Sequence, residues 1–111
     1  MTIFDKIINK EIPANIVYED DVAIAFHDIA PQAPTHILVI PKKRIDQIEN
    51  MKEEDKPVIG HLFHVATLVA KKIGLENGYR LIINNGVEGG QTVFHLHIHL
   101  LGGRTMSWPP G

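Results

Sequence analysis

The chain of 111 residues contains no cysteine. This absence excludes disulfide bonds, thiolate zinc sites and cysteine nucleophiles. Charges of the two signs nearly balance, with a net charge of -2 at pH 7, so no charge excess predicts binding to nucleic acid or to an anionic membrane. No apolar run approaches the roughly 18 residues of a membrane span, and the first residues lack the pattern of a secretory signal. We therefore expect a soluble, cytoplasmic protein with no membrane or nucleic-acid partner.

What is present predicts a single folded domain over residues 1–111. The hydrophobic share of 44% is that of an ordinary globular protein, which argues against disorder. A chain of this length has room for one small core. No repeat, low-complexity tract or linker divides it.

Two stretches show the apolar spacing of helices. Residues 3–8 follow Thr2, which forms a capping-box pattern with Asp5, and this short helix should end before Pro13. The longer helix has Asp55 as its expected N-cap and is closed by Gly74. Its apolar face comprises Ile59, Leu62, Phe63, Ala66, Val69, Ala70 and Ile73.

Five runs of the sequence read as strands. They are Ile16 to Glu19, Val22 to His27, Thr35 to Ile40, Tyr79 to Asn84, and Phe94 to Leu101. The order of helices and strands predicts an α+β domain with a mainly antiparallel five-stranded sheet, one long helix and one short helix.

The last of these strands carries the strongest functional signal. His95, His97 and His99 alternate with aliphatic residues, so in a strand all three imidazoles lie on one face. Neighbouring histidines would then be about 7 Å apart and the outer two about 13 Å. Burying three imidazoles for structural reasons alone would require a partner for each one. The row therefore indicates either a metal site or a metal-free catalytic site.

The loop before the histidines favours phosphate over metal. It contains Gly86, Gly89 and Gly90, whose backbone amides can come close to a ligand, and it runs into Gln91 and Thr92. One strand cannot bring all three histidines to one zinc ion, because zinc–nitrogen bonds are about 2 Å long. A site of two histidines completed by Asp28 or His36 remains open at this point.

Several remaining features have weaker interpretations. His61 and His64 lie three apart on the long helix, where surface exposure or packing is expected. The chain ends in an apolar Trp108-Pro109-Pro110-Gly111 segment. An exposed tryptophan is readily explained by docking on a partner subunit, which favours a homodimer.

The run from His95 to Leu101 matches the His-φ-His-φ-His-φ-φ signature (φ is apolar) of the histidine triad (HIT) superfamily. Its flanks resemble the Hint branch of purine nucleoside phosphoramidases over nearly the whole chain. The flanking segments are Thr2-Ile3-Phe4, Glu11-Ile12-Pro13-Ala14, Phe26-His27-Asp28-Ile29, Pro31-Gln32-Ala33-Pro34-Thr35-His36, Gly89-Gly90-Gln91, Leu101-Gly102-Gly103-Arg104 and the terminal Trp-Pro-Pro-Gly.

The resemblance implies a role for each catalytic residue. His97 would be the nucleophile that attacks the α-phosphorus, and His99 would hydrogen-bond a phosphate oxygen. His95 would order the triad, and His36 would support it from outside the triad by a hydrogen bond to another imidazole. No metal or other cofactor is implied.

The resemblance also implies a purine nucleotide site and a homodimer whose sheet continues from one subunit to the other. Asp28 would accept the ribose hydroxyls, and Trp108 would lie near the leaving group in the partner's site. The purine pocket would comprise Ile3, Phe4, Ile7, Phe26, His27 and Ile29. The phosphate and ribose side would comprise Asn84, Gly90, Gln91 and Thr92.

Two residues depart from the pattern of the branch. Thr92 stands where serine is familiar, and its extra methyl group could narrow the leaving-group side. Arg44 stands where some members have histidine, and it is given no catalytic role. The alternatives are a dinucleoside polyphosphate hydrolase of another HIT branch, a nucleotide-binding interaction module, and a zinc protein.

Overall fold

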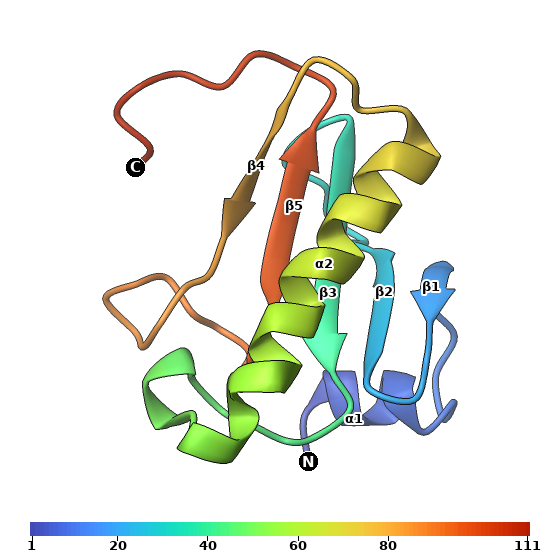
Figure 1. The fold of residues 1–111 in the computed structure, drawn as a ribbon, viewed down its shortest axis with the longest axis vertical. Coiled ribbons are helices and arrows are strands. Elements are labelled where there is room, and N and C mark those ends of the chain that lie inside the picture. Colours follow the sequence, from blue (N-terminus) through green and yellow to red (C-terminus); the bar gives the residue numbers. More distant parts are fainter.

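The structure, a computed structural model, describes residues 1–111 and confirms the α+β architecture. The chain forms two α-helices, two short 3-10 helices and five strands (Figure 1). In order they are α1 (Ile3–Ile8), β1 (Ile16–Glu19), β2 (Ala23–His27), β3 (Thr35–Pro41), η1 (Ile48–Asn50), η2 (Glu53–Asp55), α2 (Lys56–Ile73), β4 (Tyr79–Ile82) and β5 (Ile98–Gly102). No helix is both long enough and apolar enough to cross a membrane.

The strands form one sheet in the order β1-β2-β3-β5-β4, and every neighbouring pair is antiparallel. Strands β1 and β4 are therefore the two edges. Helix α2 lies across one face of the sheet, whereas α1 lies at the lower end of the sheet in the view of Figure 1. The sheet carries apolar side chains on both of its faces.

The two faces explain the continuous apolar runs of β2 and β3. In β2, Ala23 and Ala25 belong to the large core cluster under α2, whereas Ile24 and Phe26 belong to a second cluster with residues of α1. In the same way, the odd-numbered core residues of β3 belong to the cluster under α2, and the even-numbered residues Leu38 and Ile40 belong to the second cluster. A strand that is covered on both faces buries every side chain and shows no polar alternation.

Helix α1 begins as the capping-box pattern predicts. The backbone amide of Thr2 donates to Asp5 Oδ2 at 2.7 Å, which satisfies one of the free amides at the helix start. Helix α2 ends at Gly74, which has a φ of 93° in the left-handed region. Asp55 stands at the N-cap position of α2 but makes no side-chain cap there, and its carboxylate instead accepts from the Lys52 amide and from Lys43.

The predicted strand from Phe94 to Leu101 is wrong in its first half. Only Ile98–Gly102 pair as a strand, so His99 lies in β5 whereas His95 and His97 lie in the irregular segment before it. The backbone amide of Leu96 makes no sheet hydrogen bond and donates to the Ile45 carbonyl at 2.7 Å. The Pro41 carbonyl at the end of β3 accepts a hydrogen bond from the His95 side chain, so β5 and β3 pair only from Ile98 onward. Strand β4 likewise ends at Ile82, two residues before the predicted end.

Candidate active site

The histidines gather on the sheet face that carries α1. Leu96, Ile98 and Leu100 point into the core under α2, so the alternating histidines point to the opposite face. The aromatic ring of Phe4 in α1 lies edge-on to both His95 and His97, with centroid distances of 6.0 and 5.1 Å. The ring centroid of His97, which lies outside the regular strand, is only 4.8 Å from that of His99. The predicted row is therefore more compact than the strand spacing implies.

The ring of His97 is oriented by a backbone carbonyl. Its Nδ1 lies 2.7 Å from the His95 carbonyl oxygen. A carbonyl only accepts, so His97 must carry its proton on Nδ1 and donate it. This leaves an unprotonated lone pair on Nε2, because a neutral imidazole carries one proton. His97 is 7% exposed, and Nε2 is the atom that this tautomer can use as a nucleophile.

A relay of hydrogen bonds orients His99. The Gln32 backbone amide donates to His36 Nδ1 at 3.0 Å, so the ring proton of a neutral His36 must be on Nε2. That Nε2 lies 2.9 Å from His99 Nδ1 and donates to it. His99 must then carry its own proton on Nε2, which is buried and has no partner in the protein. The relay presents an N–H donor beside the ring of His97.

His95 is the most deeply buried of the triad, with no exposed surface. Its Nε2 donates to the Pro41 carbonyl at 2.9 Å, so its Nδ1 carries the lone pair. This Nδ1 has no hydrogen-bond partner and lies 3.6 Å from Asp5 Oδ1. The ring thus fixes the segment that provides the carbonyl acceptor for His97.

Burial keeps the cluster neutral. It lowers the pKa of His36, His95 and His97 below the ordinary value of 6.5, because a charged imidazole loses its hydration there. The pKa of His99 falls to about 4, since burial is reinforced by the neighbouring His97 and His36. At neutral pH the Nε2 lone pair of His97 is therefore available without a deprotonation step.

Part of the predicted purine pocket comes together beside the triad. Phe4, Ile7 and Phe26 belong to the buried cluster between α1 and the sheet, and Phe4 joins this cluster to His97. Ile3 is exposed on the same short helix, and His27 is half-buried at the end of β2.

The β2–β3 loop carries two further predicted site residues. Ile29 is 95% exposed there, so it does not join the buried apolar cluster. Asp28 shapes the loop itself, because its Oδ1 accepts from the Ala30 amide at 2.8 Å. Its other carboxylate oxygen, Oδ2, lies 3.5 Å from His36 Nε2. The structure thus places Asp28 beside the histidine relay and leaves Ile29 in solvent.

The side chain of Gln91 holds the glycine-rich loop in place. The buried Gln91 side chain accepts from the Gly86 amide at 2.9 Å and donates to the carbonyls of Asp46 and Val93. All of these bonds lie within the protein, so the side chain of Gln91 supports the loop. Thr92 is exposed. The Nδ2 atom of Asn84 lies 3.5 Å from the carbonyl oxygen of Gly90.

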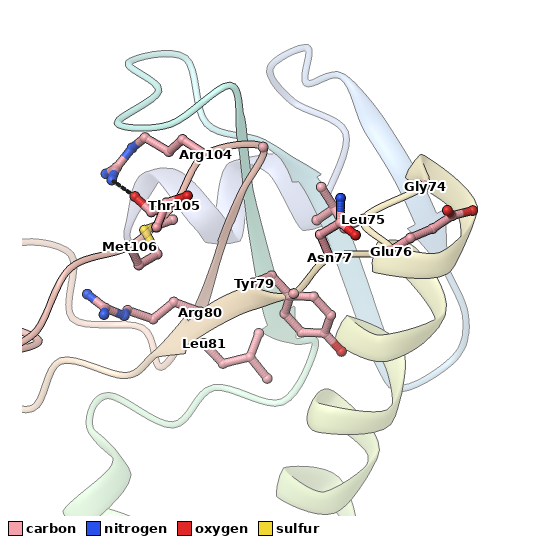
Figure 2. A pocket seen from close by; sticks show the side chains of 12 residues that line it. Gly74, Leu75, Glu76, Asn77, Tyr79, Arg80, Leu81, Arg104, Thr105 and Met106 are labelled. Carbon is pink, nitrogen blue, oxygen red and sulfur yellow. Dashed lines mark hydrogen bonds between the residues drawn. The ribbon is translucent and has the colours of Figure 1, made fainter.

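One hollow of the surface lies away from these residues. It has a volume of about 700 Å³ and is lined by residues 74–81 and 103–106, none of which is a predicted site residue. Figure 2 shows Arg80 and Leu81 of β4 beside Arg104 and Met106 of the chain after β5. Trp108 follows in the tail and is 83% exposed. The hollow therefore marks the free edge of the sheet.

One set of three side chains has the spacing of metal ligands. Asp28, His36 and His99 each offer an atom within 4.8 Å of the others. A neutral imidazole binds metal through an unprotonated nitrogen, but the Gln32 amide occupies the Nδ1 lone pair of His36 and leaves only the protonated Nε2 facing His99. The donor set fits a hydrogen-bond relay and does not fit a resident zinc ion.

Comparison with known proteins identifies the family of the chain. The family model described as the HIT domain matches residues 9–106. The chain belongs to the HIT domain family. The structure of this HIT domain is similar to that of a HIT family hydrolase from Legionella pneumophila, with a TM-score of 0.97, 49% identity and complete coverage of both chains.

Two relatives in sequence cover almost the whole HIT domain. An uncharacterized HIT-like protein of Synechococcus elongatus is 58% identical over 99% of this chain and 96% of its own length. A protein of Zea mays named as a 14 kDa zinc-binding protein is 56% identical, over 99% of this chain and 88% of its own. The name of the maize protein refers to zinc, whereas in this HIT domain the His36 tautomer opposes zinc ligation.

Sequence reasoning misses the pairing of Asp5 with Arg44. The pattern marks Asp5 only as part of a helix cap and gives Arg44 no role. In the structure Arg44 Nη1 donates to Asp5 Oδ2 at 2.8 Å, and Asp5 in turn faces His95. The two residues are 39 positions apart, and no local pattern in the sequence pairs them.

Proposed function

We propose that the protein hydrolyses the P–N bond of purine nucleoside 5'-phosphoramidates. The observation that carries this proposal is the pinned tautomer of His97, which leaves Nε2 as a free lone pair at neutral pH. The buried, unpartnered Nε2–H of His99 lies on the neighbouring ring and is a suitable donor for a phosphate oxygen. The name hydrolase given to the Legionella relative supports the general reaction class.

The reaction would proceed in two displacements. In the first, the His97 Nε2 lone pair forms a bond to the α-phosphorus while the P–N bond of the substrate breaks, and the amine leaves neutral once it is protonated. Charge that gathers on the phosphate oxygens would be stabilised by the Nε2–H of His99 and by the hydroxyl of the exposed Thr92. The product of this step is a nucleotidyl-His97. In the second step, water attacks the same phosphorus while the bond between phosphorus and His97 Nε2 breaks, so that nucleoside monophosphate is released and the Nε2 lone pair returns. The proton that the water gives up to solvent replaces the one that the amine took from solvent in the first step.

The nucleotide would lie between α1 and the sheet. Phe4, Ile7 and Phe26 support this position with a buried apolar cluster that contacts His97 through Phe4, and Ile3, His27 and Ile29 would complete the purine pocket. Asp28 would accept the ribose hydroxyls with its partly exposed carboxylate. Asn84, Gly90 and Thr92 would line the phosphate side, and Gln91 would hold their loop in place.

We further propose that the protein is a cytoplasmic homodimer. Strand β4 is an edge strand with unpaired backbone groups, and an uncovered edge of this kind is a liability in solution. The hollow along β4 is lined in part by the chain that follows β5, and the exposed Trp108 belongs to the same stretch of chain. Pairing of two β4 strands would continue the sheet and bring each tail towards the other subunit's site.

A turnover screen tests the proposed reaction. Adenosine and guanosine 5'-phosphoramidates with varied amines would be compared with diadenosine polyphosphates at equal concentration, with and without a chelator. We expect turnover of the phosphoramidates that is faster by about tenfold or more and insensitive to the chelator. Faster cleavage of the polyphosphates would assign the protein to the other HIT activity. Nucleotide binding without turnover of either substrate would indicate an interaction module.

A further inference from the structure

A second layer of charges lies behind the triad. Asp5 is only 17% exposed, and its carboxylate faces four groups: the Thr2 amide at 2.7 Å, the Thr2 hydroxyl at 3.3 Å, the Arg44 guanidinium at 2.8 Å and His95 Nδ1 at 3.6 Å. His95 is fully buried, and this Nδ1 is one of two buried side-chain nitrogen or oxygen atoms without a partner in the protein. The proposed nucleophile is oriented by the carbonyl of the same residue.

The contact between Asp5 and His95 creates a conflict. With its proton on Nε2, His95 turns a lone pair towards a carboxylate, which is unfavourable. A second proton on Nδ1 would remove the conflict and form an ion pair. His95 would then be a cation close to His97, whose ring itself becomes cationic when Nε2 bonds to phosphorus. Two imidazolium rings in one buried cluster repel each other.

Arg44 offers the other way to resolve this conflict. Its guanidinium is bonded to the Asp5 carboxylate and compensates the negative charge that would otherwise attract a proton to His95. We propose that Asp5 and Arg44 are positioning residues, a charge-compensated pair that holds His95 neutral and oriented so that His97 can become cationic during turnover. The effect of the pair on turnover rests on the proposed function. The effect of the pair on the protonation of His95 does not.

Other charges around His95 do not replace the pair. Asp5 belongs to α1, Arg44 and Asp46 belong to the chain after β3, and His97 belongs to the segment of His95 itself. Burial lowers the pKa of His95, and Arg44 acts in the same direction, whereas Asp5 and Asp46 favour a proton on the ring. Removing Arg44 therefore leaves two carboxylates acting on one ring.

The test follows the ring nitrogens of His95 by NMR in histidine-labelled protein, with assignments from single histidine variants. Arg44→Gln should raise the pH at which His95 takes its second proton, and Asp5→Asn should lower it, each by about one pH unit. Asn retains an oxygen that can cap α1, and Arg44→Lys retains the charge and should restore the wild-type midpoint. Lys56→Gln, which removes a lysine from a surface pair with Glu53, is the matched control and should change nothing.

The same variants are then assayed for phosphoramidate turnover against pH. The acid limb of kcat should move with the His95 midpoint, to higher pH in Arg44→Gln and to lower pH in Asp5→Asn, while KM changes little. Equal His95 midpoints in all variants would overturn the charge pair, whatever the substrate is. Midpoints that move while the acid limb stays fixed would overturn the positioning role. If the wild-type protein turned over no phosphoramidate, the NMR titration would still decide the physical part.

Discussion

His36 Nε2 lies 2.9 Å from His99 Nδ1, and this hydrogen bond determines which nitrogen of His99 carries the proton. The Gln32 amide determines the tautomer of His36, and His36 then determines that of His99. Three groups from the β2–β3 loop, β3 and β5 are thereby linked into one chain of donors and acceptors. The end of this chain is an N–H that the protein itself does not use.

The relay predicts the behaviour of variants at His36. His36→Ala removes the donor to His99 Nδ1, so His99 can move its proton to Nδ1 and turn a lone pair towards the phosphate oxygen. We expect kcat for phosphoramidates to fall by up to about 10²-fold, the cost of losing one oxyanion donor. His36→Gln keeps an amide donor and a carbonyl acceptor and should retain more activity. Equal activity of both variants with wild type would contradict the relay.

His97 itself should be indispensable for chemistry but not for binding. His97→Ala is expected to lower turnover by about 10³-fold or more, because the nucleophilic lone pair is lost. Binding of nucleoside monophosphate, measured by calorimetry, should change only a few-fold. In quenched reactions, mass spectrometry should detect a nucleotidylated wild-type protein and none in the variant. His64→Ala, at an exposed position of α2, is the matched control, and a similar loss there would contradict the assignment.

The buried histidines also predict how stability depends on pH. Their pKa values are lowered in the folded state, that of His99 to about 4 from 6.5, so the unfolded chain binds more protons in this interval. The free energy of unfolding should therefore be highest above pH 6.5 and should fall as the pH falls towards 4, by about 1.4 kcal/mol per pH unit for each such proton. The lowered pKa values of Asp5 and Glu19 start from 3.8 and 4.5, so these carboxylates contribute to the pH dependence only below about pH 5.

Urea unfolding at several pH values measures this slope. His99→Gln removes one of the titrating rings and should reduce the slope between about pH 5 and the ordinary histidine pKa. His64→Gln, on the exposed side of α2, is the control and should leave the slope as it is in wild type. An unchanged slope in His99→Gln would contradict burial of His99 as a cause of the pH dependence.

The sequence was sufficient to predict the elements that depend on side-chain pattern. The mainly apolar β2 and β3 and the amphipathic α2 were each identified from spacing, because burial on one or two faces dictates apolar positions directly. The face of the histidines was also predicted correctly, since alternation with Leu96 and Ile98 survives outside the regular strand. The short extent of β5 was not predicted, because it depends on where β3 ends and on the carbonyl that His95 takes from Pro41.

The tautomers of the histidines could not be predicted from sequence. Those of His97, His95 and His36 are set by backbone groups, namely the carbonyl of His95, the carbonyl of Pro41 and the amide of Gln32, and the tautomer of His99 follows from that of His36. Backbone carbonyls and amides occur all along the chain, so no residue in the sequence marks which one will be used. The Asp5–Arg44 pair is hidden for a related reason, because charged residues are common and only the fold brings these two together.

Gln91 should act on the loop rather than on the substrate. Gln91→Ala removes three hydrogen bonds from a buried position and leaves the Gly86 amide and two carbonyls without this partner. We expect the free energy of unfolding to fall by about 1–3 kcal/mol, with a further loss in kcat because the loop amides are no longer held in place. Chemical unfolding and steady-state kinetics measure the two effects. Gln47→Ala, at a half-buried position, is the control. A rise in KM without any loss of stability would instead indicate direct substrate contact by Gln91.

The free edge of the sheet predicts how the proposed homodimer can be broken. Tyr79 lies at the start of β4 with 38% of its surface exposed, and Phe63 on α2 is a matched aromatic residue with 39% exposed. In a two-fold interface along β4 the same patch of each subunit meets its own copy, so Tyr79→Asp would place two carboxylates in the interface. Sedimentation should give twice the chain mass of 12.4 kDa for wild type and for Phe63→Asp, and a lower mass for Tyr79→Asp at the same concentration. If turnover depends on the partner's tail, the dissociated variant should also lose activity as it is diluted. A wild-type protein that sediments as a single chain at tens of micromolar would contradict the dimer and leave the exposed edge of β4 as a feature of the monomer.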